Sequence, residues 1–206
     1  MKIALAGNPN CGKTTMFNAL TGSNQYVGNW PGVTVEKKTG RLKTNSEVQI
    51  IDLPGIYSLS PYSLEERVAR EYLINERPDI IINLLDATNI ERSLYLTTQL
   101  REIGIPMVIA LNMSDLLKKD QVDTDQLSKL MECPIVHVSA LKNEGLEQLI
   151  SHAYQLAQQP RPAYTNIYHG NIALAIEQIK AVISEHYEPF EQNWYAIKYL
   201  ENEEEL

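Results

Sequence analysis

Short apolar runs recur along the N-terminal part of the chain, and each is followed by a segment with helical periodicity. The runs are nearly continuous and rich in Ile, Val and Leu, which is typical of parallel strands covered by helices on both faces. They span residues 2–6, 48–52, 80–86, 107–112 and 135–138. This alternation of strand and helix predicts an α/β fold with a mostly parallel sheet.

The segments between the runs carry the spacing of amphipathic helices. We expect helices over residues 13–21, 64–76, 91–103, 125–131 and 145–158. Residues 33–43 are less apolar and predict an edge strand that pairs antiparallel with residues 48–52. The expected sheet is therefore six-stranded, with helices on both faces.

The composition changes after the last of these helices. A proline-rich linker signal occupies residues 160–162, and the remainder predicts two further helices from about Asn171 onward. We therefore expect one domain over residues 1–159 and a small helical subdomain over residues 160–206. The acidic end, residues 201–206, has no stop signal, so we expect the chain to be a piece of a longer protein.

Composition and charge narrow the classes of function. Apolar residues make up 44% and charged residues 21% of the 206 residues, which is ordinary for a folded soluble domain. A net charge of −8 without a Lys/Arg cluster argues against a nucleic-acid-binding surface. The sequence shows no signal peptide and no apolar stretch long enough to span a membrane.

The two cysteines, Cys11 and Cys133, lack metal-type spacing and predict reduced thiols of a cytosolic protein. Cys11 stands just before a predicted helix, and two interpretations of it stay open. Its thiol could have a lowered pKa at the helix N-terminus, or it could simply fill space as a small side chain.

Residues 7–14, G-N-P-N-C-G-K-T, fit the phosphate-loop pattern G-x-x-x-x-G-K-[ST] between a predicted strand and a predicted helix. In such a loop, backbone N–H groups and the helix N-terminus surround the α- and β-phosphates of a nucleotide. We expect Lys13 to reach the β- and γ-phosphate oxygens and the Thr14 hydroxyl to bind Mg²⁺. The loop alone does not distinguish ATP from GTP. The expected nucleotide contacts are Asn8, Pro9, Asn10, Cys11, Gly12, Lys13, Thr14 and Thr15.

Two further motifs predict groups around the γ-phosphate. Asp52 and Gly55 form a D-x-x-G pattern after a predicted strand, where the carboxylate can hold the Mg²⁺ water shell and the Gly55 N–H can contact the γ-phosphate. A plain turn after a strand is the alternative. Thr34, with Gly32 and Val33 before it, lies where a switch threonine closes over Mg²⁺ and the nucleotide. A threonine of the edge strand is the alternative there.

The loop after residues 107–112 predicts recognition of guanine. Asn112, Met113 and Asp115 resemble the N-K-x-D base motif of GTPases. The Asp115 carboxylate can accept hydrogen bonds from N1–H and the exocyclic amino group of guanine, a donor pair that adenine lacks. Asn112 would join this loop to the phosphate loop. Met113 replaces the usual lysine, so its packing over the base lacks a cationic end and we expect weaker nucleotide binding.

The loop after residues 135–138 predicts a further contact with the base. Ser139, Ala140 and Leu141 stand where GTPases carry an S-A-K loop. We expect the backbone N–H of Ala140 to contact O6 of guanine. Taken alone, this tripeptide is a weak match, and its position after the strand is what supports the interpretation.

Several stretches are similar to one particular family. They are residues 7–15 (G-N-P-N-C-G-K-T-T), 27–36 (V-G-N-W-P-G-V-T-V-E), 52–63 (D-L-P-G-I-Y-S-L-S-P-Y-S) and 112–115 (N-M-S-D). Together they resemble the cytosolic domain of bacterial ferrous iron transport protein B, most specifically through G-N-W-P-G-V-T-V-E. The resemblance covers residues 1 to about 155. Beyond the linker it rests on residues 194–201 (W-Y-A-I-K-Y-L-E), which are similar to the family's helical spacer.

The resemblance implies a P-loop GTPase that binds GTP, GDP and Mg²⁺ on the cytoplasmic face of the bacterial inner membrane. It also implies that a membrane permease for Fe(II) follows in the same polypeptide. Small accessory proteins of iron transport and further copies of the chain are candidate partners, and no nucleic acid is expected. The expected Mg²⁺ ligands are Thr14, Thr34 and Asp52.

The residue after D-x-x-G bears on hydrolysis. Ras-like GTPases carry a water-orienting glutamine there, whereas this chain has Ile56, so we expect slow intrinsic hydrolysis. By resemblance, K⁺ held by Asn10 and by the backbone carbonyls of Gly28 and Trp30 would neutralise the developing charge. An asparagine that stabilises its own turn is the alternative for Asn10. The expected catalytic residues are Asn10, Lys13, Thr34 and Gly55.

Two other classes of function stay open. A soluble GTPase acting on RNA or the ribosome can also carry a hydrophobic residue at the position of Ile56, although such proteins usually have a basic RNA-binding domain. Hydrophobic spans encoded after Leu206 would decide for the transporter. A non-catalytic nucleotide switch is the second class, and phosphate release measured with and without K⁺ would separate it from an enzyme.

Overall fold

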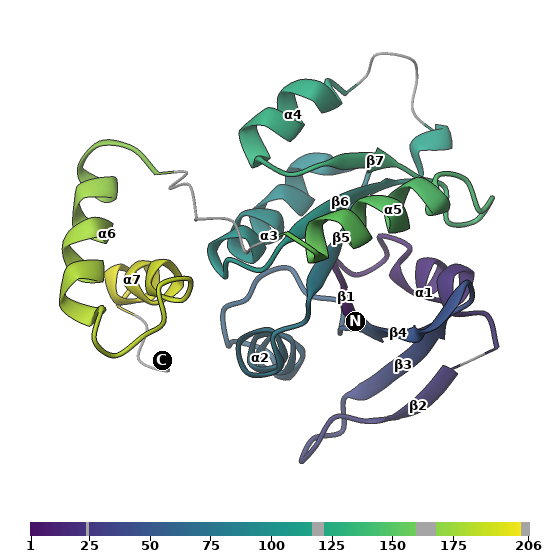
Figure 1. Ribbon diagram of the computed structural model, residues 1–206, viewed down its shortest axis with the longest axis horizontal. Coiled ribbons are helices and arrows are strands. Elements are labelled where there is room, and N and C mark those ends of the chain that lie inside the picture. Colours follow the sequence, from purple (N-terminus) through teal and green to yellow (C-terminus); the bar gives the residue numbers. More distant parts are fainter. Residues whose placement is uncertain (24, 117–121, 160–167, 203–206) are drawn as a thin grey trace.

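The computed structural model describes residues 1–23, 25–116, 122–159 and 168–202 (Figure 1). Within these ranges, seven strands form one sheet in the order β2-β3-β4-β1-β5-β6-β7. Strands β1 and β4–β7 are parallel, and β3 pairs antiparallel with both β2 and β4. The strands are β1 Lys2–Gly7, β2 Gln25–Asn29, β3 Glu36–Leu42, β4 Asn45–Asp52, β5 Ile80–Asp86, β6 Met107–Asn112 and β7 Ile135–His137.

Helices connect the strands and cover both faces of the sheet, which confirms the expected α/β class. Helices α1 and α5 pack on one face, and α2, α3 and α4 pack on the other. They are α1 Lys13–Thr21, α2 Leu64–Glu71, the π-helical turn η1 Tyr72–Glu76, α3 Ile90–Glu102, the short η2 Ser114–Leu116, α4 Thr124–Met131, α5 Leu146–Ala157, α6 Gly170–Ile183 and α7 Gln192–Leu200.

The expected strand count of six was wrong by one. The additional strand is β2, and β3 begins at Glu36 rather than at residue 33. The cause lies in the sequence of β2, Q-Y-V-G-N, whose side chains are largely exposed on both faces of the hairpin. Such a strand is held by backbone pairing with β3, so it carries no apolar alternation that a sequence pattern could reveal.

Helix α2 begins and ends for identifiable reasons. Ser63 and Glu66 form a reciprocal capping box, in which the Glu66 N–H donates to Ser63 Oγ at 3.2 Å and the Ser63 N–H donates to Glu66 Oε2 at 3.1 Å. The helix expected over residues 64–76 is α-helical only to Glu71 and continues as η1. It stops at Arg77, which has a left-handed φ of 43°.

Two apolar layers sandwich the sheet. On one side, Phe17 of α1 and Leu149 of α5 are fully buried against β1 and β5. On the other, Leu73 of η1 and Leu100 of α3 are fully buried. Burying one such side chain contributes roughly 1.5–3 kcal/mol, so these layers fix the sheet whose carboxyl edge carries the candidate site.

The two helices expected from about Asn171 onward are present as α6 and α7. They pack on each other through Ile176, Ile183, Ala196 and Ile197. The linker signal at residues 160–162 and the acidic residues 203–206 lie outside the described residues. The division into domains 1–159 and 160–206 therefore stays a prediction.

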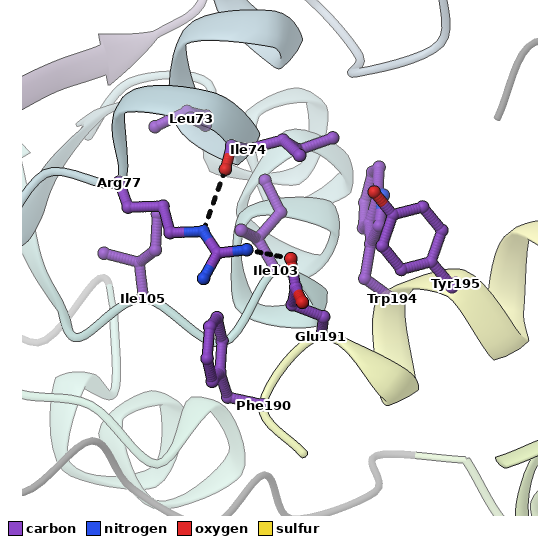
Figure 2. A pocket seen from close by; sticks show the side chains of 9 residues that line it. All are labelled: Leu73, Ile74, Arg77, Ile103, Ile105, Phe190, Glu191, Trp194 and Tyr195. Carbon is purple, nitrogen blue, oxygen red and sulfur yellow. Dashed lines mark hydrogen bonds and ion pairs between the residues drawn. The ribbon is translucent and has the colours of Figure 1, made fainter. Parts of the chain in front are cut away.

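Helix α7 is attached to the rest of the molecule around a cavity of about 20 Å³, shown in Figure 2. Trp194 is 2% exposed and belongs to the apolar layer under α2 and α3. Beside it, the Arg77 guanidinium forms an ion pair with Glu191 and lies 4.5 Å from the centroid of the Phe190 ring. No helix in the described ranges combines the length and the apolar character that crossing a bilayer requires.

Candidate nucleotide-binding site

All the sequence motifs except the switch follow parallel strands, so their loops meet at the carboxyl edge of the sheet. The phosphate loop follows β1, the D-x-x-G motif follows β4, and the two base motifs follow β6 and β7. In open α/β sheets, this edge is where ligands bind. The fold therefore brings together motifs that are far apart in the sequence.

The phosphate loop requires glycine at position 12. Gly12 has a φ of 89°, and a Cβ added there would lie 2.3 Å from Asn112 Nδ2. The loop closes through a hydrogen bond from the Cys11 N–H to Asn8 O at 3.3 Å. Asn10 is exposed, with a left-handed φ of 66°, a conformation that asparagine tolerates better than most residues. This geometry agrees with both open interpretations of Asn10.

The Asn112 side chain joins three loops. Its Nδ2 donates to Cys11 O at 2.9 Å, and its Oδ1 accepts from the Ala140 N–H at 3.0 Å. The residue is only 3% exposed. The expected link between the base loop and the phosphate loop is therefore present. However, the Ala140 N–H, which was expected to contact O6 of guanine, donates to Asn112 in this structure.

Lys13 and Asp52 form an ion pair at the centre of the site. Lys13 Nζ lies 2.5 Å from Asp52 Oδ1, and Asp52 is 6% exposed. Burial raises the pKa of the Asp52 carboxyl, and the Lys13 charge opposes that rise. Thr14 and Thr15 are exposed on the first turn of α1. A hydroxyl and a carboxylate are oxygen donors of the kind that Mg²⁺ prefers, so Thr14 and Asp52 fit that ion.

The Asp115 carboxylate is paired with a lysine that the motif analysis missed. Lys142 Nζ lies 3.0 Å from Asp115 Oδ2. Hydrogen bonds from Lys142 and from the Ser139 hydroxyl lower the pKa of Asp115, and the same contact raises the pKa of Lys142. Lys142 directly follows the S-A-L tripeptide, so its place beside a base motif was the available signal. Leu141 points away, with 81% exposure.

The side chain of Ile56 does not face the site. It is 2% exposed and belongs to the apolar layer that also contains Trp30 and Tyr72. Its backbone N–H donates to Gly7 O at 3.3 Å, and the preceding Gly55 lies against Pro9, since a Cβ on Gly55 would be 3.2 Å from Pro9 Cα. The D-x-x-G loop is thus packed on the phosphate loop through its backbone.

The switch segment forms the far end of the β2–β3 hairpin (Figure 1). Thr34 is exposed at its tip, together with Gly32, while Val33 is half-buried. Trp30 is 6% exposed and packs edge-on against Tyr72, with 5.3 Å between ring centroids. The Lys37 ammonium lies 4.4 Å from the centre of the indole ring. In this arrangement Trp30 holds the hairpin on η1.

The expected K⁺ ligands lie in two different places. Asn10 is in the phosphate loop, whereas the Trp30 carbonyl accepts from the Val33 N–H at 3.3 Å inside the hairpin turn. Gly28 is paired with Lys37 across the hairpin. The structure thus keeps the two switch carbonyls within the hairpin and does not gather them around Asn10.

The surroundings of Cys11 decide between the two interpretations of its thiol. The side chain is 1% exposed, and burial raises the pKa of its thiol to about 11. Its Sγ would lie 2.8 Å from a Cβ on Gly7. The thiol therefore fills space under the loop, and the interpretation with a lowered pKa was wrong.

Comparison with known proteins points to one family. A family model described as ferrous iron transport protein B matches residues 1–153. The Fe(2+) transporter FeoB of Salmonella typhimurium strain LT2 is 50% identical over 156 residues, which cover 72% of this chain and 20% of that protein. An Fe(2+) transport protein A/Fe(2+) transporter FeoB fusion protein of Porphyromonas gingivalis strain W83 is 41% identical, over 100% of this chain and 26% of that protein.

Solved structures agree with this similarity along almost the whole chain. A crystal structure of an S. thermophilus NFeoB variant bound to GDP has a TM-score of 0.93 and 47% identity, covering 99% of this chain and 80% of that one. The cytosolic domain of the T. maritima FeoB iron transporter, in a GMPPNP form, has a TM-score of 0.90 and 38% identity, covering 100% and 82%. By contrast, the chain spans only about a fifth to a quarter of the full length of the Salmonella typhimurium and Porphyromonas gingivalis proteins.

Proposed function

The chain belongs to the ferrous iron transport protein B family, and on that premise we propose that it is the GTP-binding and GTP-hydrolysing domain of an Fe(II) transporter. The observation that carries the proposal is the convergence of four loops at one sheet edge. There Asn112 joins the phosphate loop to the two base loops, and the ion pair of Lys13 with the buried Asp52 carboxylate joins the phosphate loop to the D-x-x-G loop. This arrangement offers a nucleotide complementary groups at both its base and its phosphates.

The phosphates would replace Asp52 as the partner of Lys13. With a nucleotide bound, the Lys13 ammonium would contact the β- and γ-phosphate oxygens, and the Asp52 and Thr14 oxygens would hold Mg²⁺. Mg²⁺, when bound there, would supply positive charge that stabilises the phosphates. The 2.5 Å ion pair supports this exchange because it already places the cation and the carboxylate side by side. The remaining P-loop residues contribute backbone N–H groups.

Guanine would be read by Asp115. The lowered pKa of its carboxyl keeps it ionised at neutral pH, as an acceptor for two guanine donors must be. Lys142 would share this carboxylate and screen part of its charge. Met113, half-buried with a left-handed φ of 60°, would pack beside the base.

Hydrolysis would depend on K⁺ and on a rearranged switch. Because the Ile56 side chain is buried in the core, it cannot orient water, and turnover without help is expected to be slow. K⁺ bound by Asn10 and by the carbonyls of Gly28 and Trp30 would stabilise the charge that develops on the phosphates. Since those carbonyls lie within the hairpin, the hairpin must open before they can reach the ion, and Thr34 would move with them.

The partners proposed for the whole protein follow from its relatives. We infer a membrane permease portion in the same polypeptide, small accessory proteins of iron transport, and a position on the cytoplasmic face of the bacterial inner membrane. Residues 160–206 would form part of a helical spacer between the GTPase domain and that permease. The attachment of α7 through Trp194 and Glu191 supports such a connection.

Phosphate release with purified chain tests the proposal. GTP should be hydrolysed and ATP should not, and KCl should give faster release than matched NaCl. Lys13→Ala is the control for contaminating enzymes, since it removes the phosphate-binding cation. Equal release from GTP and ATP, or the same rate in the Lys13→Ala variant, would contradict the assignment.

A further inference from the structure

The first turn of helix α3 lies between the phosphate loop and the D-x-x-G loop. The backbone carbonyl of Arg92 accepts a hydrogen bond from Asn8 Nδ2 at 3.3 Å, and Asn8 is 6% exposed within the phosphate loop. The side chain of Arg92 reaches the other loop, where its guanidinium carbon lies 4.2 Å from the centroid of the Tyr57 ring. One residue of α3 therefore contacts both loops that are expected to surround the nucleotide phosphates.

The contact between Arg92 and Tyr57 has the geometry of a cation–π interaction. Such an interaction forms when a guanidinium lies within about 6 Å of the centroid of an aromatic ring. Arg92 is exposed and Tyr57 is 40% exposed, so water weakens the attraction without abolishing it. A contact of this exposed kind changes an equilibrium constant by about two- to fivefold.

Tyr57 stands two residues after Gly55, whose N–H is expected to contact the γ-phosphate. Gly55 has no side chain, so its position depends on its neighbours in the loop. Further along, the N–H of the buried Leu59 donates to Gln99 Oε1 at 2.7 Å. Arg92 and Gln99 are seven residues apart on α3, which places them on one face of the helix. Helix α3 thus holds the loop at two points, of which the Arg92 contact is nearer to Gly55 along the chain.

We propose that Arg92 is a positioning residue for the D-x-x-G loop, an inference that rests on the proposed function. By stacking on Tyr57, the guanidinium holds the loop in place before a nucleotide arrives, so that Gly55 needs less ordering to reach a γ-phosphate. GDP lacks that phosphate. Arg92 therefore favours GTP over GDP without touching either nucleotide. When the contact is removed, the binding-competent loop is less populated, and the affinity for GTP falls in proportion to that population.

The position of the loop decides the direction of this effect. A contact that held the loop away from the phosphates would raise the affinity for GTP when removed. Here Gly55 already packs on the phosphate loop, since a Cβ on it would lie 3.2 Å from Pro9 Cα, and the Ile56 N–H donates to Gly7 O at 3.3 Å. The Arg92 contact coexists with this packed arrangement, so its removal should loosen the loop.

Calorimetric titration with GDP and with the non-hydrolysable GTP analogue GMPPNP, both with Mg²⁺, tests the proposal. Arg92→Ala should weaken binding of GMPPNP by about two- to fivefold and leave the affinity for GDP unchanged. Arg92→Lys keeps a cation and should restore part of the loss. Arg41→Ala is the matched control for lost charge. Arg41 is exposed on β3 and donates to Ser46 O at 3.0 Å near the start of β4, at the opposite edge of the sheet.

Variants of Tyr57 show whether the ring is the partner. Tyr57→Phe keeps the ring and should keep the parent ratio of GMPPNP to GDP affinity, whereas Tyr57→Leu should lower it as Arg92→Ala does. Combining Tyr57→Leu with Arg92→Ala should cause no further loss, because both changes remove the same contact.

A purely structural role for Arg92 would weaken binding of both nucleotides alike. An equal loss for GDP and GMPPNP, an unchanged ratio in Arg92→Ala, or full additivity of Tyr57→Leu and Arg92→Ala would overturn the proposal. If the parent chain bound neither nucleotide, the proposed function itself would fail, and this inference with it. That result is distinct from a parent chain that binds both nucleotides and an Arg92→Ala variant that keeps the same ratio.

Discussion

Replacing Asn112 with alanine tests whether one side chain holds the three loops together. Its amide group is buried, donates to Cys11 O at 2.9 Å and accepts from the Ala140 N–H at 3.0 Å. Alanine would leave this carbonyl and this N–H without partners. Each buried group left unpaired costs about 1–3 kcal/mol. We therefore expect the free energy of unfolding to fall by about 2–6 kcal/mol, a large part of the roughly 5–15 kcal/mol typical of a domain.

Urea unfolding followed by circular dichroism measures this loss directly. Asn18→Ala is the matched control, because Asn18 is exposed on α1 and such surface changes usually stay within about 0.5 kcal/mol. Asn112→Asp keeps the shape and the acceptor for Ala140 but places a carboxylate oxygen against Cys11 O, so its free energy of unfolding should fall as well, through the lost Cys11 contact and the burial of a charge. A change below about 1 kcal/mol for Asn112→Ala, with an unchanged denaturant slope, would refute the reasoning.

Further predictions concern the nucleotide. Asp115→Asn should move preference from guanosine to xanthosine diphosphate, with a loss of about 1–3 kcal/mol for GDP; unchanged GDP affinity by calorimetry would count against base reading. Asn10→Ala should abolish the difference in phosphate release between KCl and NaCl, and a persisting difference would remove Asn10 from the K⁺ site. Thr34→Ala should slow GTP hydrolysis while sparing GDP binding, because the γ-phosphate orders the switch; normal turnover would contradict this. Stopped-flow release of a fluorescent GDP analogue should be fast and should slow in Met113→Lys, whereas a residence time of hours in the parent chain would be inconsistent with weak packing over the base.

The central part of the fold could be predicted because its strands are buried on both faces. Strands such as β5 and β6 consist almost entirely of buried apolar residues, so their bounds follow from the sequence pattern. Strand β2 has no such pattern, because backbone pairing with β3 holds it and its side chains face solvent. Helix α2 was located by its periodicity, but the change to π-helical geometry at Tyr72 depends on packing that a sequence does not encode locally.

The residues of the candidate site likewise fall into two groups, those that the sequence predicted and those that it did not. Lys13, Asp52 and Asn112 were predictable because fixed motifs place them at strand ends, and the structure joins Lys13 to Asp52 and Asn112 to the phosphate loop. Lys142 was missed because it lies one residue beyond its motif. The docking of Trp30 on Tyr72 was not predictable either, since it joins two segments that no shared motif connects.

The burial of both tryptophans has a practical consequence. Trp30 and Trp194 are the only two in the chain; one lies in the switch hairpin and the other in the attachment of α7. Indole emission responds to the polarity of its surroundings, so each residue is a native optical probe of a different region. Trp194→Phe would leave the switch as the sole emitter, and Trp30→Phe would leave only the helical attachment. Movements of the two regions could then be timed separately, one in each variant, without attaching any dye.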